Sequence, residues 1–245
     1  MLKHSHVAIL LVLLIGCSTV FTGCKPESLV STSQEVGIGR QASQQIESNY
    51  PVNKDPELNR LVNEIGQNLV QYSERQDIKY TFKVLDLKDV NAVSLPGGWI
   101  YVYKGLIDNT KGDVNELAGV IAHEIGHIAA RHHAEMIGRE TFAGILVVTL
   151  TRGDVRQWAN LFANLTLLRW SRKHEYESDR LGVKYMYQSR YSAEGLVNFL
   201  ERLQQIQKDK PSEFEQIFRT HPVTEERVKR AKNFLADLKA GTRDP

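Results

Sequence analysis

The chain has 245 residues, which is enough for one well-buried core, so a single globular domain is the expectation. Its 31 basic and 29 acidic residues are interspersed and give a formal net charge of +2, so the basic patch that marks a nucleic-acid-binding protein is missing. We therefore expect no nucleic-acid partner.

The N-terminal residues have the pattern of a secretory signal peptide. Residues 1–16 carry Lys3 and then an apolar run, 7–15, that is too short to span a bilayer comfortably. The run ends in LIGC, which resembles the bacterial lipobox and predicts cleavage before Cys17 and lipidation of that cysteine. An uncleaved signal anchor is one alternative, and Cys24, which follows FTG, is a second candidate for the lipid. With Cys17 lipidated, Cys24 has no partner for an intrachain disulfide.

A folded domain is predicted over 35–240, after a polar, turn-rich tether at 17–34. A helix is expected to start at Pro56. Residues 79–105 alternate as strands do, with Pro96-Gly97-Gly98 as a turn, and they predict a small sheet with a hairpin. The other predicted helices are 35–49, 113–136, 140–150, 155–189, 192–207, 211–219 and 223–239. The predicted fold class is therefore α+β and mostly α.

The stretch GVIAHEIGHIAA, residues 119–130, places three polar side chains in an otherwise apolar helix. His123 and His127 are four residues apart and share one helix face, so both imidazoles can reach one metal ion. Glu124 lies beside them, in the H-E-x-x-H arrangement in which the glutamate takes a proton from the attacking water. Gly126 costs about 1 kcal/mol relative to alanine in a helix interior, which suggests that another element packs closely there. The alternative interpretation is a pair of ordinary core histidines.

A third metal ligand is predicted in RKHEYESDRLG, residues 172–182. Glu175 and Asp179 are again four residues apart, and Gly182 continues their face of the helix without a side chain. Two facing helices, one with the two histidines and one with these carboxylates, could enclose a single ion. The alternative is a solvated, charged helix face, because basic and acidic residues surround both carboxylates.

HEIGH together with KHEYESDRLG resembles the gluzincin zinc peptidases, and specifically the family that includes HtpX and the CAAX prenyl endopeptidases. The resemblance implies a zincin-like metallopeptidase domain with a small sheet packed beside the HExxH helix, and one zinc ion per chain. It further implies that His123, His127 and Glu175 bind zinc and that Glu124 is the general base. Asp179 would hydrogen-bond a ligating imidazole.

Two further stretches resemble conserved elements of that family. NAVSLPGGWI is similar to a strand beside the metal helix, which implies that Asn91, Ala92, Gly97 and Gly98 belong to a substrate-binding strand that holds an extended peptide. An ordinary hairpin is the alternative.

RTHPVTEERV is similar to the family's T-H-P-x-x-x-x-R element. It implies that His221 approaches the zinc, either to stabilise the oxyanion or to occupy the open position as a brake, and that Arg227 helps to hold or polarise the site. The alternative for His221-Pro222 is a simple helix start.

The stretch GCSTVFTGCK resembles lipoprotein members of the family, which again favours Cys17 as the lipidated residue. The chain is expected to represent a periplasmic subgroup without transmembrane helices or tetratricopeptide repeats. Because Ser18 follows Cys17 where an aspartate commonly retains lipoproteins in the inner membrane, the outer membrane is the expected location. The resulting hypothesis is a zinc endopeptidase that cleaves misfolded or misassembled envelope proteins. The alternatives are a chaperone-like binding lipoprotein with a latent or structural zinc site, and a structural lipoprotein in which HEIGH is coincidental.

Overall fold

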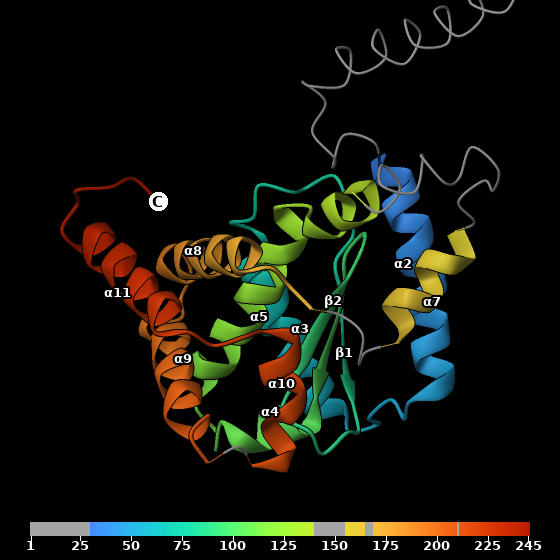
Figure 1. Ribbon diagram of the computed structural model, residues 1–245, viewed down its shortest axis with the longest axis horizontal. Helices are drawn as coiled ribbons and strands as arrows, with labels where there is room; N and C mark the ends of the chain where they lie inside the picture. The colour runs from blue at the N-terminus through green and yellow to red at the C-terminus, as the bar shows by residue number, and fades with distance from the viewer. Residues whose placement is uncertain (1–29, 140–154, 165–168, 210) are drawn as a thin grey trace, which may run out of the picture.

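A computed structural model describes residues 30–139, 155–164, 169–209 and 211–245 (Figure 1). The predicted signal peptide, Cys17 and the predicted helix 140–150 lie outside these residues. None of the described helices is both long and apolar enough to cross a membrane. In chain order the elements are α2 (Thr32–Asn49), α3 (Pro56–Val70), β1 (Thr81–Leu85), β2 (Ala92–Leu95), β3 (Trp99–Tyr103), α4 (Lys104–Asn109), α5 (Val114–Ala129), a helix over 132–139, α7 (Val155–Ala163), α8 (Arg172–Gln188), α9 (Glu194–Ile206), the 3-10 turn η2 (Ser212–Phe214), α10 (Glu215–Thr220) and α11 (Glu225–Lys239).

The three strands form one small sheet in the order β1-β3-β2. β2 and β3 form the predicted antiparallel hairpin, while β1 runs parallel to β3. Gly97 and Gly98 occupy the turn with φ of +74° and +112°, a region that side chains rarely adopt, so the two glycines fit this turn for a steric reason. The prediction of a small sheet with a hairpin in a mostly helical domain is confirmed.

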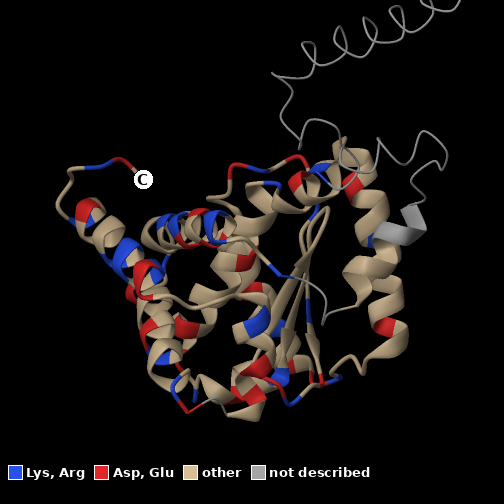
Figure 2. Ribbon diagram, in the orientation of Figure 1, with Lys and Arg blue, Asp and Glu red and all other residues tan. Residues whose placement is uncertain are grey.

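Both faces of the sheet are covered by helices, as Figure 1 shows. Because side chains alternate along a strand, Ile100 and Val102 face one hydrophobic cluster and Tyr101 and Tyr103 face the other. The first and larger cluster is built with α3, α5, α8, α9, α10 and α11. The second is built with α2, the helix over 132–139 and α7. On the outer helices α8 and α11, charges of both signs alternate (Figure 2).

Helix α5 runs through the larger cluster, and 13 of its 16 residues are buried. Asp113 caps its N-terminus by accepting from the main-chain N–H groups of Asn115 and Glu116. The Glu116 side chain, in the first turn of α5, forms an ion pair with Arg202 of α9. The N-terminal cap and the ion pair with α9 therefore both stabilise the position of α5 inside the domain.

Two helix predictions were wrong about continuity. The predicted helix 113–136 breaks after Ala129, because Arg131 takes a left-handed conformation with φ of +58° before a new helix begins at 132. The predicted helix 155–189 is two helices: α7 packs against α2, whereas α8 packs against α5. The two parts lie on opposite sides of the sheet (Figure 1), so one straight helix could not supply both.

A buried ion cluster joins the start of α2 to the end of α5. α2 begins at Thr32 rather than at the predicted residue 35, because Ser31 and Gln34 form a reciprocal capping box. Glu35, in the first turn, accepts hydrogen bonds at 2.8 and 3.1 Å from Arg75 and at 2.6 and 2.8 Å from Arg131. We call Glu35, Arg75 and Arg131 the arginine clamp.

The arginine clamp also satisfies main-chain oxygens at both helix ends. Arg75 donates to the carbonyl of Ile128 at 3.1 Å, and Arg131 donates to the carbonyl of Val30. Helix-terminal carbonyls have no partner inside the helix, so these bonds complete the end of α5. The clamp thereby fixes the helix that carries HEIGH against the N-terminal end of the folded domain.

Candidate metal centre

α5 and α8 approach each other closely because each carries a glycine at their contact. A Cβ added to Gly126 would lie 2.9 Å from the main-chain oxygen of Ser178, and one added to Gly182 would lie 3.2 Å from the main-chain nitrogen of His123. Any side chain at these two positions would press on the facing helix. The glycines thus allow the close helix contact that the sequence predicts.

This contact brings four buried donor groups together: His123 and His127 from α5, Glu175 from α8, and His221 from the end of α10. His123 Nε2 lies 3.1 Å from His127 Nε2 and 3.3 Å from His221 Nδ1. Glu175 Oε1 lies 3.3 Å from His127 Nε2 and 3.2 Å from His221 Nδ1. Four ligands at about 2.0–2.1 Å from a tetrahedral zinc ion would be separated by about 3.3 Å, so the spacing fits zinc.

The hydrogen-bonding chemistry of the cluster also calls for a cation. Asp179 Oδ1 lies 2.9 Å from His123 Nδ1, so that ring nitrogen carries the hydrogen and His123 Nε2 presents a lone pair. This lone pair faces the nitrogen of His127 and the carboxylate of Glu175. Acceptors that face one another in a buried site repel unless a positive charge lies between them. The donor set of two imidazoles and one carboxylate is the kind that zinc prefers.

Arg227 from α11 holds the two carboxylates of α8 in their charged form. Its Nε and Nη2 each donate to Asp179 at 2.7 Å, and its Nη1 contacts Glu175. Burial alone would raise the pKa of Glu175 and of Asp179, but the Arg227 charge together with contacts from neighbouring histidines outweighs burial and lowers the pKa of both. Arg227 is thus placed to orient Asp179 and Glu175.

Glu124 lies beside the donor cluster without being one of its four members. Its Oε2 accepts a hydrogen bond from Ser94 Oγ at 2.7 Å, and its Oε1 lies 3.4 Å from His221 Nε2. Only 1% of the residue is exposed. The strand residue Ser94 therefore holds the carboxylate at the site while one oxygen stays directed towards the cluster.

His221 faces Glu175 and Glu124 at once, at 3.2 and 3.4 Å. Burial alone would lower the pKa of His221, but these two carboxylates outweigh burial and raise it. The short helix α10 ends at Thr220, and the backbone leaves the helix at His221, which turns the imidazole inward. The His221 imidazole thus lies against the buried donor cluster, between Glu175 and Glu124.

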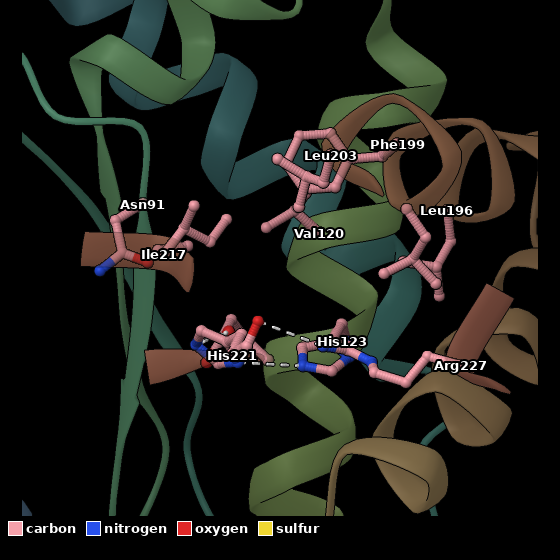
Figure 3. A pocket seen from close by; sticks show the side chains of 12 residues that line it. Asn91, Val120, His123, Leu196, Phe199, Leu203, Ile217, His221 and Arg227 are labelled. Carbon is pink, nitrogen blue, oxygen red and sulfur yellow. Dashed lines mark hydrogen bonds and ion pairs between the residues drawn. The ribbon is translucent and has the colours of Figure 1, made fainter. Parts of the chain in front are cut away.

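A pocket opens beside the cluster, and Figure 3 shows His123, His221 and Arg227 at its rim. Asn91 and Ala92 of the predicted substrate strand line this pocket, whose remaining walls are mostly apolar side chains of α5, α9 and α10. Gly97 and Gly98 do not line it. They pack at the far end of the hairpin, against α2 and the residue Lys79.

β2 is an edge strand of the described sheet, and its residues are almost completely buried. The Asn91 carbonyl accepts from the Tyr103 N–H at 3.0 Å, so residues 91, 93 and 95 pair with β3 while Ala92 and Ser94 turn their main-chain groups to the outer edge. The carbonyl of Ser94 is already bound by His133 Nε2 at 2.9 Å. Among the described residues, the main-chain groups of Ala92, which lines the pocket, and the N–H of Ser94 have no hydrogen-bond partner on this edge.

Comparison with known families identifies the fold and its chemistry. Residues 55–235 match peptidase family M48. The chain belongs to this family. Family M48 peptidases are zinc metalloenzymes, and the buried cluster of this chain supplies a matching donor set, so the predicted family, fold and zinc cofactor are confirmed.

Several curated members of the M48 family are similar to the chain. It is 27% identical to the beta-barrel assembly-enhancing protease of Yersinia pestis over 89% of its own length and 47% of that relative's. It is 27% identical to the metalloprotease LoiP of Escherichia coli (strain K12), covering 92% of this chain and 96% of that protein. It is 29% identical to the mitochondrial metalloendopeptidase OMA1 of Schizosaccharomyces pombe, covering 88% and 66%. The chain thus spans about half the length of the first of these relatives.

Sequence reasoning missed three residues that complete this M48 site. Ser94 binds Glu124, Trp170 stacks on His127 with ring centroids 4.4 Å apart, and the His132 imidazole contacts the outer nitrogen of His127. His132 had a detectable signal, since a His-His pair follows HEIGH after an interval of four residues in the sequence. Trp170 had none, because it was placed inside a helix that the structure interrupts.

Proposed function

We propose that the protein is a zinc-dependent endopeptidase of the bacterial cell envelope that cleaves extended segments of misfolded or misassembled proteins. The observation that carries the proposal is the carboxylate of Glu124 beside the four-donor cluster, at a pocket that is also lined by Ala92 of the edge strand β2. The names of the similar proteins, among them a beta-barrel assembly-enhancing protease, support the choice of substrate class.

The chemistry follows from the positions of the side chains. His123, His127 and Glu175 would hold zinc, which when bound supplies a Lewis acid that polarises the scissile carbonyl and acidifies water. Glu124 takes the proton of the attacking water and passes it to the leaving amine. The Ser94 hydroxyl keeps the Glu124 carboxylate aimed at the reacting atoms. Arg227 acts through Glu175 and Asp179 rather than on the substrate, since both carboxylates occupy its guanidinium.

Substrate main chain is the natural partner of the β2 edge. Ala92 presents a free N–H and C=O, and an added peptide strand can pair there with little demand on sequence. Asn91 is fully buried, and its side-chain amide has no hydrogen-bond partner in the described structure although it lines the pocket. An unpaired buried amide is costly, so a peptide group in the pocket would satisfy it.

We propose that His221 acts as a brake in the substrate-free protein, rather than as the oxyanion stabiliser. In support of this role, His221 Nδ1 lies 3.3 Å from His123 Nε2, at the spacing of a fourth zinc ligand. Catalytic zinc sites keep that fourth position open for water or substrate. A substrate would therefore have to displace the imidazole, and His221→Ala should raise the cleavage rate of an unfolded substrate.

A lipid on Cys17 and an outer-membrane location remain part of the proposal. The lipobox-like LIGC segment supports them, and residues 17–31 would tether the folded domain to the membrane. Labelling with a radioactive fatty acid in cells tests the lipid: wild type should be labelled, Cys17→Ser should not, and Cys24→Ser should match wild type. Loss of label from Cys24→Ser instead would move the anchor to that residue.

Zinc content and cleavage together test the central proposal. Purified wild type should contain one zinc per chain and degrade an unfolded protein such as reduced casein. Glu124→Gln should retain zinc and lose about 10²–10⁴-fold in rate, because it lacks the general base. Equal rates for wild type and Glu124→Gln would exclude this mechanism. Zinc bound without cleavage by wild type or His221→Ala would favour the chaperone-like alternative.

A further inference from the structure

The two histidine ligands of the metal centre are supported by different chemical groups. His123 Nδ1 faces the carboxylate of Asp179 at 2.9 Å. His127 Nδ1 faces another imidazole, since it lies 3.0 Å from Nδ1 of His132. His132 is 1% exposed and His127 is fully buried, so neither nitrogen can turn to water instead.

The proton positions in this pair follow from the zinc site. His127 must present a bare Nε2 to the metal, so its hydrogen is on Nδ1 and is donated to His132. His132 Nδ1 must then be the acceptor, which places the His132 hydrogen on Nε2. That nitrogen lies 3.5 Å from Oε2 of Glu177, a carboxylate on α8. The result is a line of three groups in which Glu177 orients His132, and His132 orients His127.

Packing holds this line in place. The His132 ring stacks on His174, with centroids 4.3 Å apart and planes 24° apart. On the metal side, Trp170 stacks on His127 in the same way. His132 also lies immediately after the left-handed turn at Arg131, which ends α5 and directs the next helix back across its end.

We propose that His132 is a positioning residue for zinc binding: it fixes the tautomer and ring orientation of His127 through the Nδ1 contact. Partners of this kind, bonded to a ligand rather than to the metal, typically change metal affinity by about 10–100-fold when removed. The side chain touches neither substrate nor metal in this role. The inference rests on the zinc site and not on which substrate is cleaved.

The test measures the zinc affinity of three full-length variants and of wild type, by competition with a chromophoric chelator. His132→Leu removes the acceptor and should weaken zinc binding by about 10–100-fold. His132→Asn keeps an acceptor oxygen near the position of Nδ1 and should recover most of that loss. His133→Leu, the same change at the neighbouring buried histidine, whose Nε2 bonds the Ser94 carbonyl instead of a ligand of the metal centre, should bind zinc as wild type does.

Two further readouts separate positioning from a general loss of structure. Thermal unfolding of the metal-free proteins shows whether each variant is folded, and the increase in midpoint on adding zinc should shrink for His132→Leu. The visible spectrum of the cobalt-substituted protein should change in His132→Leu and return towards wild type in His132→Asn. Wild-type zinc affinity in His132→Leu, or equal weakening in the leucine and asparagine variants, would overturn the inference. Either result would leave the Glu124 test of peptidase activity unaffected.

Discussion

Two clusters of buried charge lie along α5, and only one of them is complete by itself. In the arginine clamp, both oxygens of Glu35 receive hydrogen bonds, and the guanidinium groups of Arg75 and Arg131 also bind main-chain oxygens. In the metal centre, imidazole nitrogens and a carboxylate of Glu175 face one another within 3.1–3.3 Å. The first cluster is satisfied by protein groups alone, and the second requires a cation.

This difference between the arginine clamp and the metal centre indicates a structural role for the first and a binding role for the second. A closed network of buried charges fixes the relative position of elements, and removing one member leaves the others uncompensated. An open network is retained at a cost in stability because it binds something. Variants should therefore divide into those that change unfolding and those that change metal binding or cleavage.

The largest expected change in unfolding comes from the arginine clamp. Glu35→Ala should lower the free energy of unfolding by about 3–5 kcal/mol, because it removes the buried carboxylate that two guanidinium groups share. Glu124→Gln keeps the hydrogen bond from Ser94 and should unfold as wild type does. Urea unfolding of the metal-free proteins measures both.

A control for Glu35 lies on α3. Glu64 also pairs with a cation, Arg60, at 2.9 Å, but both side chains are about half exposed. Glu64→Ala should therefore cost no more than about 1 kcal/mol. Similar losses for Glu35→Ala and Glu64→Ala would show that the arginine clamp is not a stabilising network.

Disturbing the contact between α5 and α8 should have a smaller effect, which appears both in the free energy of unfolding and in zinc affinity. In Gly126→Ala the new methyl group would press on the main chain of Ser178, so we expect a loss of about 1–3 kcal/mol in unfolding free energy. The displaced α8 carries Glu175, so zinc affinity should fall as well. Chelator competition and urea unfolding on the same samples check the two parts.

Gly37 provides the control for this substitution. It lies within α2, and a Cβ added there meets no atom within 4 Å. Gly37→Ala should therefore stabilise the protein by up to about 1 kcal/mol through helix propensity and leave zinc affinity unchanged. A stabilised Gly126→Ala with normal zinc affinity would contradict the close contact between α5 and α8.

The smallest effect concerns acid sensitivity and comes from His133. Burial lowers the pKa of His133 to about 3, although its bond to the Ser94 carbonyl opposes the shift. In the unfolded chain the His133 imidazole binds a proton below about pH 6.5, whereas in the folded chain it stays neutral. The free energy of unfolding therefore falls as the pH is lowered from about 6.5 to about 3. The maximum slope is about 1.4 kcal/mol per pH unit.

Urea unfolding at pH 7.0 and 5.5 measures that contribution. Metal-free wild type should lose about 1 kcal/mol more than His133→Gln between these pH values, because glutamine does not titrate. The other histidines are common to both proteins and cancel in the difference. An identical loss in the two proteins would mean that folding does not lower the pKa of His133.

The sequence predicted the inner part of the metal centre because helical spacing is local information. His123 and His127 share a face by their separation of four residues, and Glu175 and Asp179 do the same on α8. His221 and Arg227 have no such spacing to either pair. Only resemblance to the family suggested them, since their approach depends on how α10 and α11 pack.

The errors in the fold arose where tertiary contacts override local propensity. Arg131 breaks a predicted helix without a glycine or proline, and its left-handed backbone is held by the ion pair with Glu35. The local sequence near Trp170 predicts a helix. In the structure, however, the main-chain N–H of Trp170 donates to the Thr220 carbonyl at 3.1 Å. Neither partner is near in sequence, so no local pattern could reveal the interruption.

The stacking of Trp170 on His127 gives the protein an optical reporter of its own metal centre. The two ring centroids are 4.4 Å apart, and the sequence contains only three tryptophans. A paramagnetic ion held by His127 would lie next to this indole and quench its emission, whereas diamagnetic zinc would not act by that route. Metal exchange can therefore be followed by fluorescence on unlabelled protein, in real time and for every variant that keeps Trp170.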